Sequence, residues 1–278
     1  MNDLELIRSK APLFDSLIDK LCLDLSPTEE DQSIVEAIRW PEVYVNSETG
    51  KVYQPHHEEE RAFVDLDNPR YALVKGGEGG GKSCAAIIKT LDKLQKGMSG
   101  IMVSTDLPHF KRSLWAEFRR WCPLSAIVNR ERYRLDESWV PSHSFALHFR
   151  SERGTISTLY CGGIEDPTGW EGPNVNFAHF DEARRHDTPQ ALKVLDGRVR
   201  IAGPNNEPPQ LYISTTPKKH WLYDYFGPIN EDGPDPYEAF KRESRVITLL
   251  TRDNEAAGNL AVGFTVNRGK TLTESEKR

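Results

Sequence analysis

Apolar residues recur with a helical period at the start of the chain and with a strand-like pattern after residue 71. Between residues 3 and 24 the spacing predicts an amphipathic helix, whose apolar side chains are Leu4, Ile7, Leu13, Leu17 and Leu21. A second helix is predicted from Ser26, because Pro27 suits the first helical position and acidic residues follow it. The segment 42–54, EVYVNSETGKVYQ, predicts a hairpin that turns at residues 48–50.

From residue 71 onward, short apolar segments alternate with helical ones. Strands are predicted at residues 71–75, 100–105, 145–150, 157–162, 175–180, 211–215 and 245–251. Helical patterns follow the first two strands, at 82–97 and 108–121. Such alternation predicts an α/β fold with a mainly parallel central sheet flanked by helices, beside a small helical N-terminal subdomain.

The same patterns divide the chain into three expected parts. A helical N-terminal segment with its hairpin, residues 1–50, is expected to pack on an α/β domain at 51–255. A polar tail or linker follows at 256–278.

Composition narrows the class of protein. No apolar run reaches the length of about 18–20 residues that a membrane helix needs, and the acidic start lacks a signal-peptide core, so a cytosolic protein without a membrane partner is expected. The net charge of −6 is unusual for a passive DNA-binding protein, so any DNA contact must be local or depend on a larger ring. The cysteines are scattered and are predicted to be reduced structural thiols; they are Cys22, Cys84, Cys122 and Cys161.

The stretch LVKGGEGGGKSCAA, residues 73–86, predicts a loop that binds phosphate. Gly76, four residues and then Gly81-Lys82-Ser83 match the pattern G-x-x-x-x-G-K-[ST], between a strand and a helix. Glycines let backbone N–H groups point at the phosphates, Lys82 would lie along the β- and γ-phosphates, and Ser83 would bind Mg²⁺. The predicted nucleotide-binding residues are Gly76, Gly77, Glu78, Gly79, Gly80, Gly81, Lys82, Ser83 and Cys84.

A carboxylate pair ends the strand in NVNFAHFDEA. Asp181 is predicted to hold Mg²⁺, and Glu182 to orient and deprotonate an attacking water, which favours a hydrolase. The gap between loop and pair leaves room for an intervening strand at 100–106, the layout of ATPases with an additional strand between the two. A switch GTPase would need an N/TKxD motif, and the sequence has none.

The strand in QLYISTTPKKHW ends in hydroxyl side chains and is stopped by Pro217. Ser214, Thr215 and Thr216 are predicted to sense the γ-phosphate and couple its loss to motion. The alternative is that threonine is present only because it favours strands.

Together these motifs resemble the ATPase domain of the large terminase subunit of tailed bacteriophages, over about residues 50–255. The resemblance rests on YQPHHEEERAFVD, GGEGGGKS, GWEGPNVNFAHFDEA, LYISTTP and HWLYDYF. It implies a Mg²⁺-dependent, ATP-hydrolysing motor that drives double-stranded DNA into a procapsid. The implied partners are DNA, a portal protein, a small terminase subunit and further copies of the chain, in a ring expected to be pentameric on the portal and monomeric in isolation. The implied location is the host cytoplasm.

The resemblance assigns roles residue by residue. Lys82 and Ser83 match the Walker A motif, Asp181 the Walker B acid and Glu182 the catalytic glutamate, and residues 214–216 match the coupling motif. The adenine-reading segment falls near residues 54–63, where Glu60 stands at the expected glutamine position and Gln54 is a substitute.

Two departures concern arginine. The family often carries one in the phosphate loop, where this chain has Glu78, and one in Gly-x-Arg-Gly, where it has GWEG at 169–172. Glu78 is expected to face outward while its N–H still serves the loop. The finger is then expected from another arginine, and the candidates after the carboxylate pair are Arg184, Arg185, Arg198 and Arg200.

Members of this family continue into a nuclease domain, and a chain ending at Arg278 is expected to be the motor domain alone and not to cleave DNA. DNA-contact candidates are the basic groups Lys111-Arg112, Arg119-Arg120, Arg130/Arg132/Arg134 and Lys218-Lys219. Two alternatives stay open: another translocase or helicase of this class, and a nucleotide-binding assembly module that hydrolyses ATP slowly.

Overall fold

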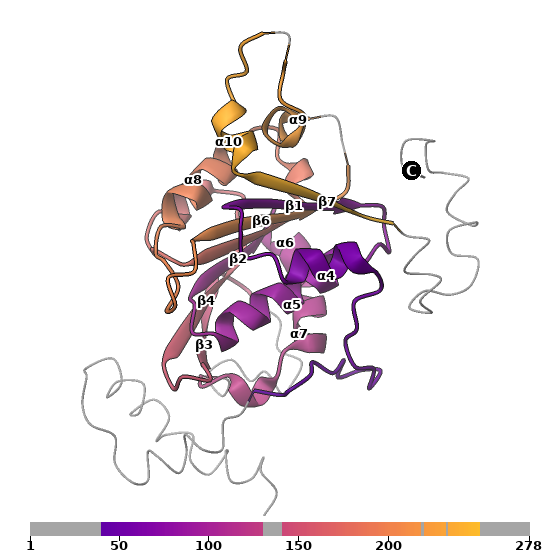
Figure 1. Ribbon diagram of the computed structural model, residues 1–278. Helices are drawn as coiled ribbons and strands as arrows, with labels where there is room; N and C mark the ends of the chain where they lie inside the picture. The colour runs from indigo at the N-terminus through magenta and orange to yellow at the C-terminus, as the bar shows by residue number, and fades with distance from the viewer. Residues whose placement is uncertain (1–39, 130–140, 218–219, 232, 251–278) are drawn as a thin grey trace, which may run out of the picture.

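The computed structural model describes residues 40–129, 141–217, 220–231 and 233–250. Within these ranges lies a seven-stranded sheet in the order β3-β4-β2-β5-β6-β1-β7 (Figure 1). The strands are β1 (Tyr71–Gly76), β2 (Gly100–Ser104), β3 (Phe145–Arg150), β4 (Ile156–Gly163), β5 (Phe177–Asp181), β6 (Gln210–Thr215) and β7 (Ser244–Leu249).

The sheet confirms the predicted α/β architecture. β3 and β4 are antiparallel and every other neighbouring pair is parallel. Each predicted strand forms, with ends shifted by no more than a few residues. The central strands are buried on both faces, as continuous apolar runs such as GIMVS and QLYIST predict.

Helices cover both faces of the sheet (Figure 1). They are α4 (Glu58–Val64), α5 (Lys82–Gln95), α6 (Leu107–Phe110), a π-helical turn η1 (Lys111–Trp115), α7 (Ala116–Trp121), α8 (Gln190–Arg198), α9 (Trp221–Phe226) and α10 (Glu238–Arg242). Short 3₁₀ turns lie at η2 (Leu124–Ala126), η5 (Pro167–Trp170) and η6 (Ala183–Arg185).

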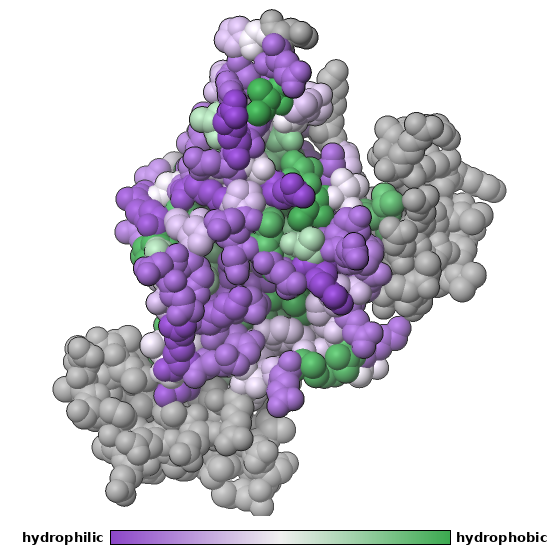
Figure 2. Space-filling model, in the orientation of Figure 1, coloured by the Kyte–Doolittle hydropathy of each residue, from purple (hydrophilic) through white to green (hydrophobic). Residues whose placement is uncertain are grey.

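The two faces carry separate cores because side chains alternate along each strand. Ala72 and Val74 of β1 pack in the core beneath α4, α5 and α7, whereas Tyr71 and Leu73 pack in the core beneath α8, α9 and α10. Outside these cores, the face of the molecule seen in Figure 2 is mostly hydrophilic, with small apolar areas. None of the helices in the described ranges has the length and apolar character that crossing a membrane requires.

The predicted helix at 108–121 forms as one helical segment, α6 to α7, with a π-helical turn in its middle. The predicted hairpin is reduced to one antiparallel bridge, between Val45 and Val52, with Gly50 in the left-handed region at φ 69°. Its turn is joined to α7, because the N–H of Ser47 donates to the carbonyl of Arg120 at 2.8 Å.

The sequence-based choice of the strand that separates the loop strand from the carboxylate strand was wrong. The segment at 100–106 forms β2, which lies on the far side of β5. β6 lies between β1 and β5, since it pairs with both. The hydroxyl residues at the end of β6 therefore lie between the phosphate loop and the carboxylate pair.

The remaining predictions for the two ends of the chain fall outside the described residues. These are the helices at 3–24 and from Ser26, the tail at 256–278, Cys22 and the basic residues Arg130, Arg132, Arg134, Lys218 and Lys219.

Candidate nucleotide-binding site

The phosphate loop joins β1 to α5 at the carboxyl edge of the sheet. Gly79 and Gly81 have φ values of 75° and 81°, in the left-handed region that favours glycine. A Cβ on Gly76 would lie 2.2 Å from the carbonyl oxygen of Leu249 in β7. No side chain caps α5, so the N–H groups of its first turn are available to an anion.

Lys82, the first residue of α5, is almost buried, with 7% of its surface exposed. Its ammonium donates to the carbonyl of Gly77 at 2.8 Å, which holds the side chain along the loop. Burial lowers the pKa of Lys82, while the negative charges of Glu182 and Asp181 raise it. The loop lysine and the carboxylate pair are thus brought into one electrostatic unit.

Asp181, at the end of β5, is 1% exposed. Its Oδ1 accepts a 2.6 Å hydrogen bond from the Ser214 hydroxyl. Burial raises the pKa of Asp181 to about 7, against the lowering effects of the Ser214 hydrogen bond and of Lys82. Its Oδ2 is buried and has no hydrogen-bond partner among the described residues.

That orphaned oxygen fits the expected Mg²⁺. Mg²⁺ prefers hard oxygen ligands and is often bound by one or two carboxylates together with phosphate and water. Asp181 would supply its free Oδ2 and Ser83 its hydroxyl from the start of α5, as the sequence predicts. The residues present therefore fit the metal.

Glu182 follows β5 in the left-handed region at φ 52°, which is uncommon for a residue with a side chain. Its N–H donates to the carbonyl of Ser214 at 2.7 Å. Its carboxylate is held from two sides, by Arg184 Nε at 2.8 Å and by the Thr216 hydroxyl at 3.4 Å. The predicted base is thus engaged in an intramolecular ion pair.

The three predicted coupling residues each contact the neighbourhood of the carboxylate pair. Ser214 donates to Asp181 and Thr216 donates to Glu182. The hydroxyl of Thr215 accepts from the N–H of Arg184 at 3.4 Å. Because β6 lies next to β5, these contacts follow from register: Asp181 stands opposite Ser214.

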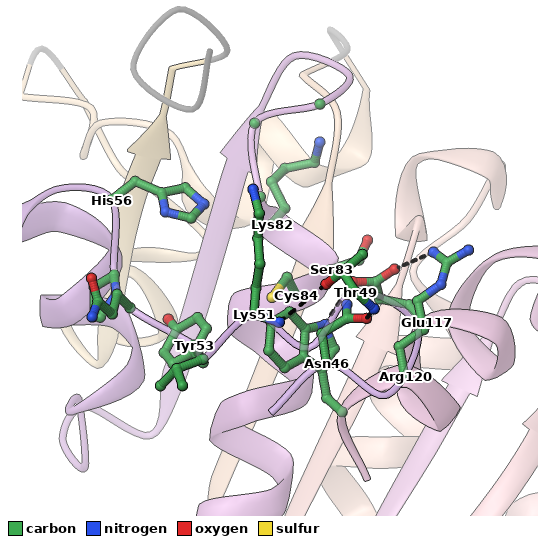
Figure 3. A pocket seen from close by; sticks show the side chains of 17 residues that line it. Asn46, Thr49, Lys51, Tyr53, His56, Lys82, Ser83, Cys84, Glu117 and Arg120 are labelled. Carbon is green, nitrogen blue, oxygen red and sulfur yellow. Dashed lines mark hydrogen bonds and ion pairs between the residues drawn. The ribbon is translucent and has the colours of Figure 1, made fainter. Parts of the chain in front are cut away.

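A pocket of about 810 Å³ opens beside the loop. Figure 3 shows Tyr53 and His56 on one side, Glu117 and Arg120 on the other, and Lys82 between them. We call it the hairpin pocket; its lining residues are Asn46, Thr49, Lys51, Val52, Tyr53, Gln54, Pro55, His56, Gly79, Gly80, Gly81, Lys82, Ser83, Cys84, Glu117, Arg120 and Trp121.

The two adenine-reading candidates lie differently with respect to this pocket. Gln54 lines it. Glu60 does not and is fully buried, where its carboxylate accepts from the Tyr53 hydroxyl and from the N–H of His56, both at 2.9 Å. Glu60 therefore supports Tyr53, which itself lines the pocket.

Sequence reasoning missed the contribution of α7 to this pocket. Arg120 belongs to a basic pair that was a candidate for DNA contact, but it forms ion pairs with Glu48 at 2.8 Å and Glu117 at 2.9 Å beside the pocket. Trp121 packs edge to face on Tyr53, with ring centroids 5.9 Å apart. The local sequence carries no signal for this, since the approach of α7 to the hairpin is a tertiary contact.

The arginine-finger candidates fall into two groups. Arg184 pairs with Glu182, and Arg185 is exposed and forms no ion pair within the described part of the chain. Arg198 and Arg200 flank Val175 through backbone hydrogen bonds, six residues before Asp181, which places them about 20 Å away along β5. Those two arginines can reach only a neighbouring chain's site. Glu78 is exposed on the loop.

His179 was also missed. It is fully buried in β5, and its Nε2 lies 2.9 Å from the Ser214 hydroxyl. Burial lowers the pKa of His179 to about 3. A histidine two residues before Asp181 in an otherwise apolar strand was the available signal.

Comparisons with known proteins identify the fold. No family model matches the sequence, and no curated protein matches it. The ATPase domain of the large terminase of Thermus phage P74-26 is similar in structure, with 14% identity and a TM-score of 0.53, over 91% of this chain and 96% of that one.

A full large terminase from a thermophilic bacteriophage is similar at 11% identity and a TM-score of 0.55, over 79% of this chain and 51% of that one. The same terminase in complex with ADP matches at 12% identity and a TM-score of 0.51, over 78% and 50% of the two chains. The chain thus spans about half the length of that terminase. The resemblance seen in the sequence is confirmed at the level of the fold, which is that of phage large terminase ATPase domains.

Proposed function

We propose that this chain is an ATP-hydrolysing motor of the large-terminase type, which drives double-stranded DNA into a procapsid. One observation carries the proposal: the hydroxyl end of β6 contacts both carboxylates of a pair whose charges act on the loop lysine. A phosphate loop, an acid pair and hydroxyls between them are the parts that phosphoanhydride hydrolysis requires. The shared fold directs the proposal to terminases rather than to other ATPases of this class.

In this proposal the loop and α5 hold the phosphates of ATP. The N–H groups of the loop and of the first turn of α5 would surround the phosphates, and Lys82 would exchange its bond to Gly77 for a phosphate oxygen. Mg²⁺, held by Ser83 and Asp181, would neutralise charge on the phosphates. The terminase that binds ADP supports a nucleotide in this fold.

Glu182 would orient and deprotonate the attacking water. To do so it must leave Arg184, whose Nε now donates to it at 2.8 Å. Thr216 contacts the same carboxylate, so a change at the γ-phosphate could pass through Glu182 into β6. The exposed Arg185 is the finger candidate best placed to reach a neighbouring chain.

The base would lie in the hairpin pocket, against Tyr53, Gln54 and Trp121. The proposed partners are double-stranded DNA, a portal protein, a small terminase subunit and further copies of the chain in a ring. Lys111-Arg112 remains a candidate DNA contact, and Arg112 is exposed. The proposed setting is the host cytoplasm, and no nuclease activity is expected of residues 1–278.

ATP turnover by the purified chain tests the proposal. Glu182→Ala should lower turnover by about 100-fold or more, because general-base catalysis contributes that much. Lys82→Ala should weaken nucleotide binding roughly 10–100-fold, the value of one charged hydrogen bond. Glu171→Ala, which removes an exposed carboxylate outside the site, is the matched control and should leave both unchanged.

The motor function is tested by adding DNA and an assembled portal. Stimulated turnover and DNA movement are expected, and both should disappear in Glu182→Ala. Turnover that is indifferent to Glu182→Ala would contradict the assignment of the base.

A second candidate is an assembly module that uses ATP to set its oligomeric state and hydrolyses it slowly. The ion pair between Arg184 and Glu182 favours it, as does a glutamate at the loop position where an arginine is common. Slow turnover that neither DNA nor portal stimulates, combined with ATP-dependent oligomerisation, would support this candidate instead.

A further inference from the structure

His179 lies in the core layer directly below the candidate site. It precedes Asp181 by two residues in β5, so both side chains are on the same face of the sheet, the face covered by α5. Its ring stacks on Tyr212 with centroids 5.2 Å apart and an interplanar angle of 18°. Its Nε2 approaches the hydroxyl oxygen of Ser214 at 2.9 Å. A histidine that served packing alone would not need this last contact.

The hydrogen-bond inventory of Ser214 determines which atom donates. A serine hydroxyl has one proton to give and two lone pairs to receive. That proton goes to Asp181 Oδ1, over a short distance of 2.6 Å. The contact with His179 must then run from Nε2–H to the hydroxyl oxygen. Nδ1 is left as the unprotonated nitrogen, and it is buried with no hydrogen-bond partner among the described residues.

The direction of these two bonds has a consequence for Asp181. Without a donor on its other side, the Ser214 hydroxyl could rotate away from the carboxylate. With Nε2–H in place, its proton points at Oδ1, so Oδ1 is occupied and Oδ2 is the oxygen without a partner. We propose that His179 is a positioning residue that acts through Ser214, holding Asp181 so that Oδ2 alone faces the Mg²⁺ of the bound nucleotide.

This inference rests on the proposed function, because it needs a nucleotide-bound Mg²⁺ at Asp181. Residues that orient a metal ligand from behind change metal affinity by about 10–100-fold when they are replaced. Two substitutions separate positioning from packing. His179→Phe keeps an aromatic ring against Tyr212 but has no donor, whereas His179→Gln carries an amide N–H near the place of Nε2.

The experiment measures the binding of fluorescently labelled ADP to the full chain, with Mg²⁺ and with EDTA. His179→Phe should reduce the Mg²⁺-dependent gain in affinity by about 10-fold. Its affinity in EDTA should stay that of the wild type, and His179→Gln should restore the gain to within about threefold. Equal Mg²⁺ dependence in wild type and His179→Phe would overturn the proposal, as would failure of His179→Gln in a variant that binds ADP normally in EDTA.

Tyr212→Phe is the matched control. It removes a buried polar contact from the same core, the 2.7 Å bond between the Tyr212 hydroxyl and Thr90, but does not touch Ser214. Its Mg²⁺ dependence should equal that of the wild type. A loss as large as in His179→Phe would show that any disturbance of this core suffices and would contradict a specific role for His179.

Nitrogen NMR of the histidine rings tests the geometry without any nucleotide. The signal absent from His179→Gln identifies His179 among the eight histidines of the chain. The expected state is Nε2 protonated and Nδ1 unprotonated, with a shifted Nε2 proton in Ser214→Ala. A protonated Nδ1 would refute the inference even if MgADP binds, whereas the expected tautomer in a chain that ignores Mg²⁺ would refute the proposed function instead.

Discussion

The phosphate loop, residues 76–83, and the carboxylate edge, formed by Asp181, Glu182 and residues 214–216, lie at the same end of the sheet but are stabilised differently. The loop is shaped by backbone, with glycines at φ values of 75° and 81° and its main side-chain contact inside the loop itself. The edge is shaped by side chains of two strands 33 residues apart in the chain, which exchange hydrogen bonds. One half of the site is thus local in sequence, and the other depends on strand pairing.

The difference teaches where each half is vulnerable. A loop made by backbone tolerates changes of its exposed side chain and fails where a Cβ meets neighbouring backbone. An edge made by side chains tolerates no loss of a hydrogen-bond partner without an effect on the charges it holds. The following changes test this contrast, beginning with the largest expected effect.

Gly76→Ala should be the most damaging change in the loop. Its Cβ would lie 2.2 Å from the carbonyl oxygen of Leu249, and backbone cannot yield as a side chain can. Overpacking of this kind costs about 2–3 kcal/mol of the free energy of unfolding. Gly172→Ala is the control, because no atom lies within 4 Å of its Cβ, and a surface change should stay within about 0.5 kcal/mol. Chemical denaturation measures both, and equal stability of the two variants would contradict this account of the loop.

Asp181→Asn should stabilise the metal-free chain at pH 8. Burial raises the pKa of Asp181 to about 7, so the folded state keeps a proton that the unfolded state releases near its ordinary value of 3.8. Folding therefore loses stability as the pH rises from about 4 to 7, and the loss is complete above 7. Asparagine cannot ionise, so the variant should exceed the wild type by on the order of 2 kcal/mol at pH 8, since each unit of pKa shift is worth about 1.4 kcal/mol.

The advantage of Asp181→Asn should shrink as the pH is lowered towards 5. Denaturation at both pH values, without Mg²⁺, measures it. A variant that is less stable than the wild type at pH 8 would mean that the carboxylate edge is not strained by its buried charge. With MgADP the order should reverse, because the variant lacks a charged metal ligand.

Arg184→Ala should raise the basal ATP turnover of the isolated chain. Arg184 holds Glu182 at 2.8 Å, and a partly exposed ion pair contributes about 0.2–1 kcal/mol, so its removal should increase turnover about two- to fivefold. Arg185→Ala removes the neighbouring exposed charge and should leave basal turnover unchanged. Steady-state kinetics at saturating ATP measures both. A fall in Arg184→Ala alone would show that this arginine assists its own site.

Glu78→Arg should have the smallest effect. Glu78 is exposed on the loop, at a position where terminases often have arginine, and an exposed charge contributes little, so basal turnover should rise by about twofold. Glu78→Gln separates the gain of a positive charge from the loss of a negative one. Unchanged or lower turnover in Glu78→Arg, at normal nucleotide affinity, would exclude this position as a finger in the same chain.

The sequence was sufficient for features that depend on neighbouring residues. The glycine spacing predicted the loop between β1 and α5, and apolar runs predicted strands such as Phe145–Arg150 at the ends they have. It was misleading about proximity. Glu60 was a candidate for the base and is buried behind Tyr53, and Arg120 was a candidate for DNA and is paired with two glutamates. Neither burial nor a partner on another element can be read from a residue's own position.

Local spacing thus accounts for the phosphate loop and for an acid pair at the end of an apolar strand, since both follow from backbone geometry over a few residues. The order of strands in the sheet is a property of the folded chain. It puts β6 rather than β2 between the two halves of the site, and so brings Ser214 to Asp181 and His179 to Ser214. These contacts join residues up to 35 positions apart, and packing of both faces of the sheet selects them among the pairings that the pattern of apolar residues allows.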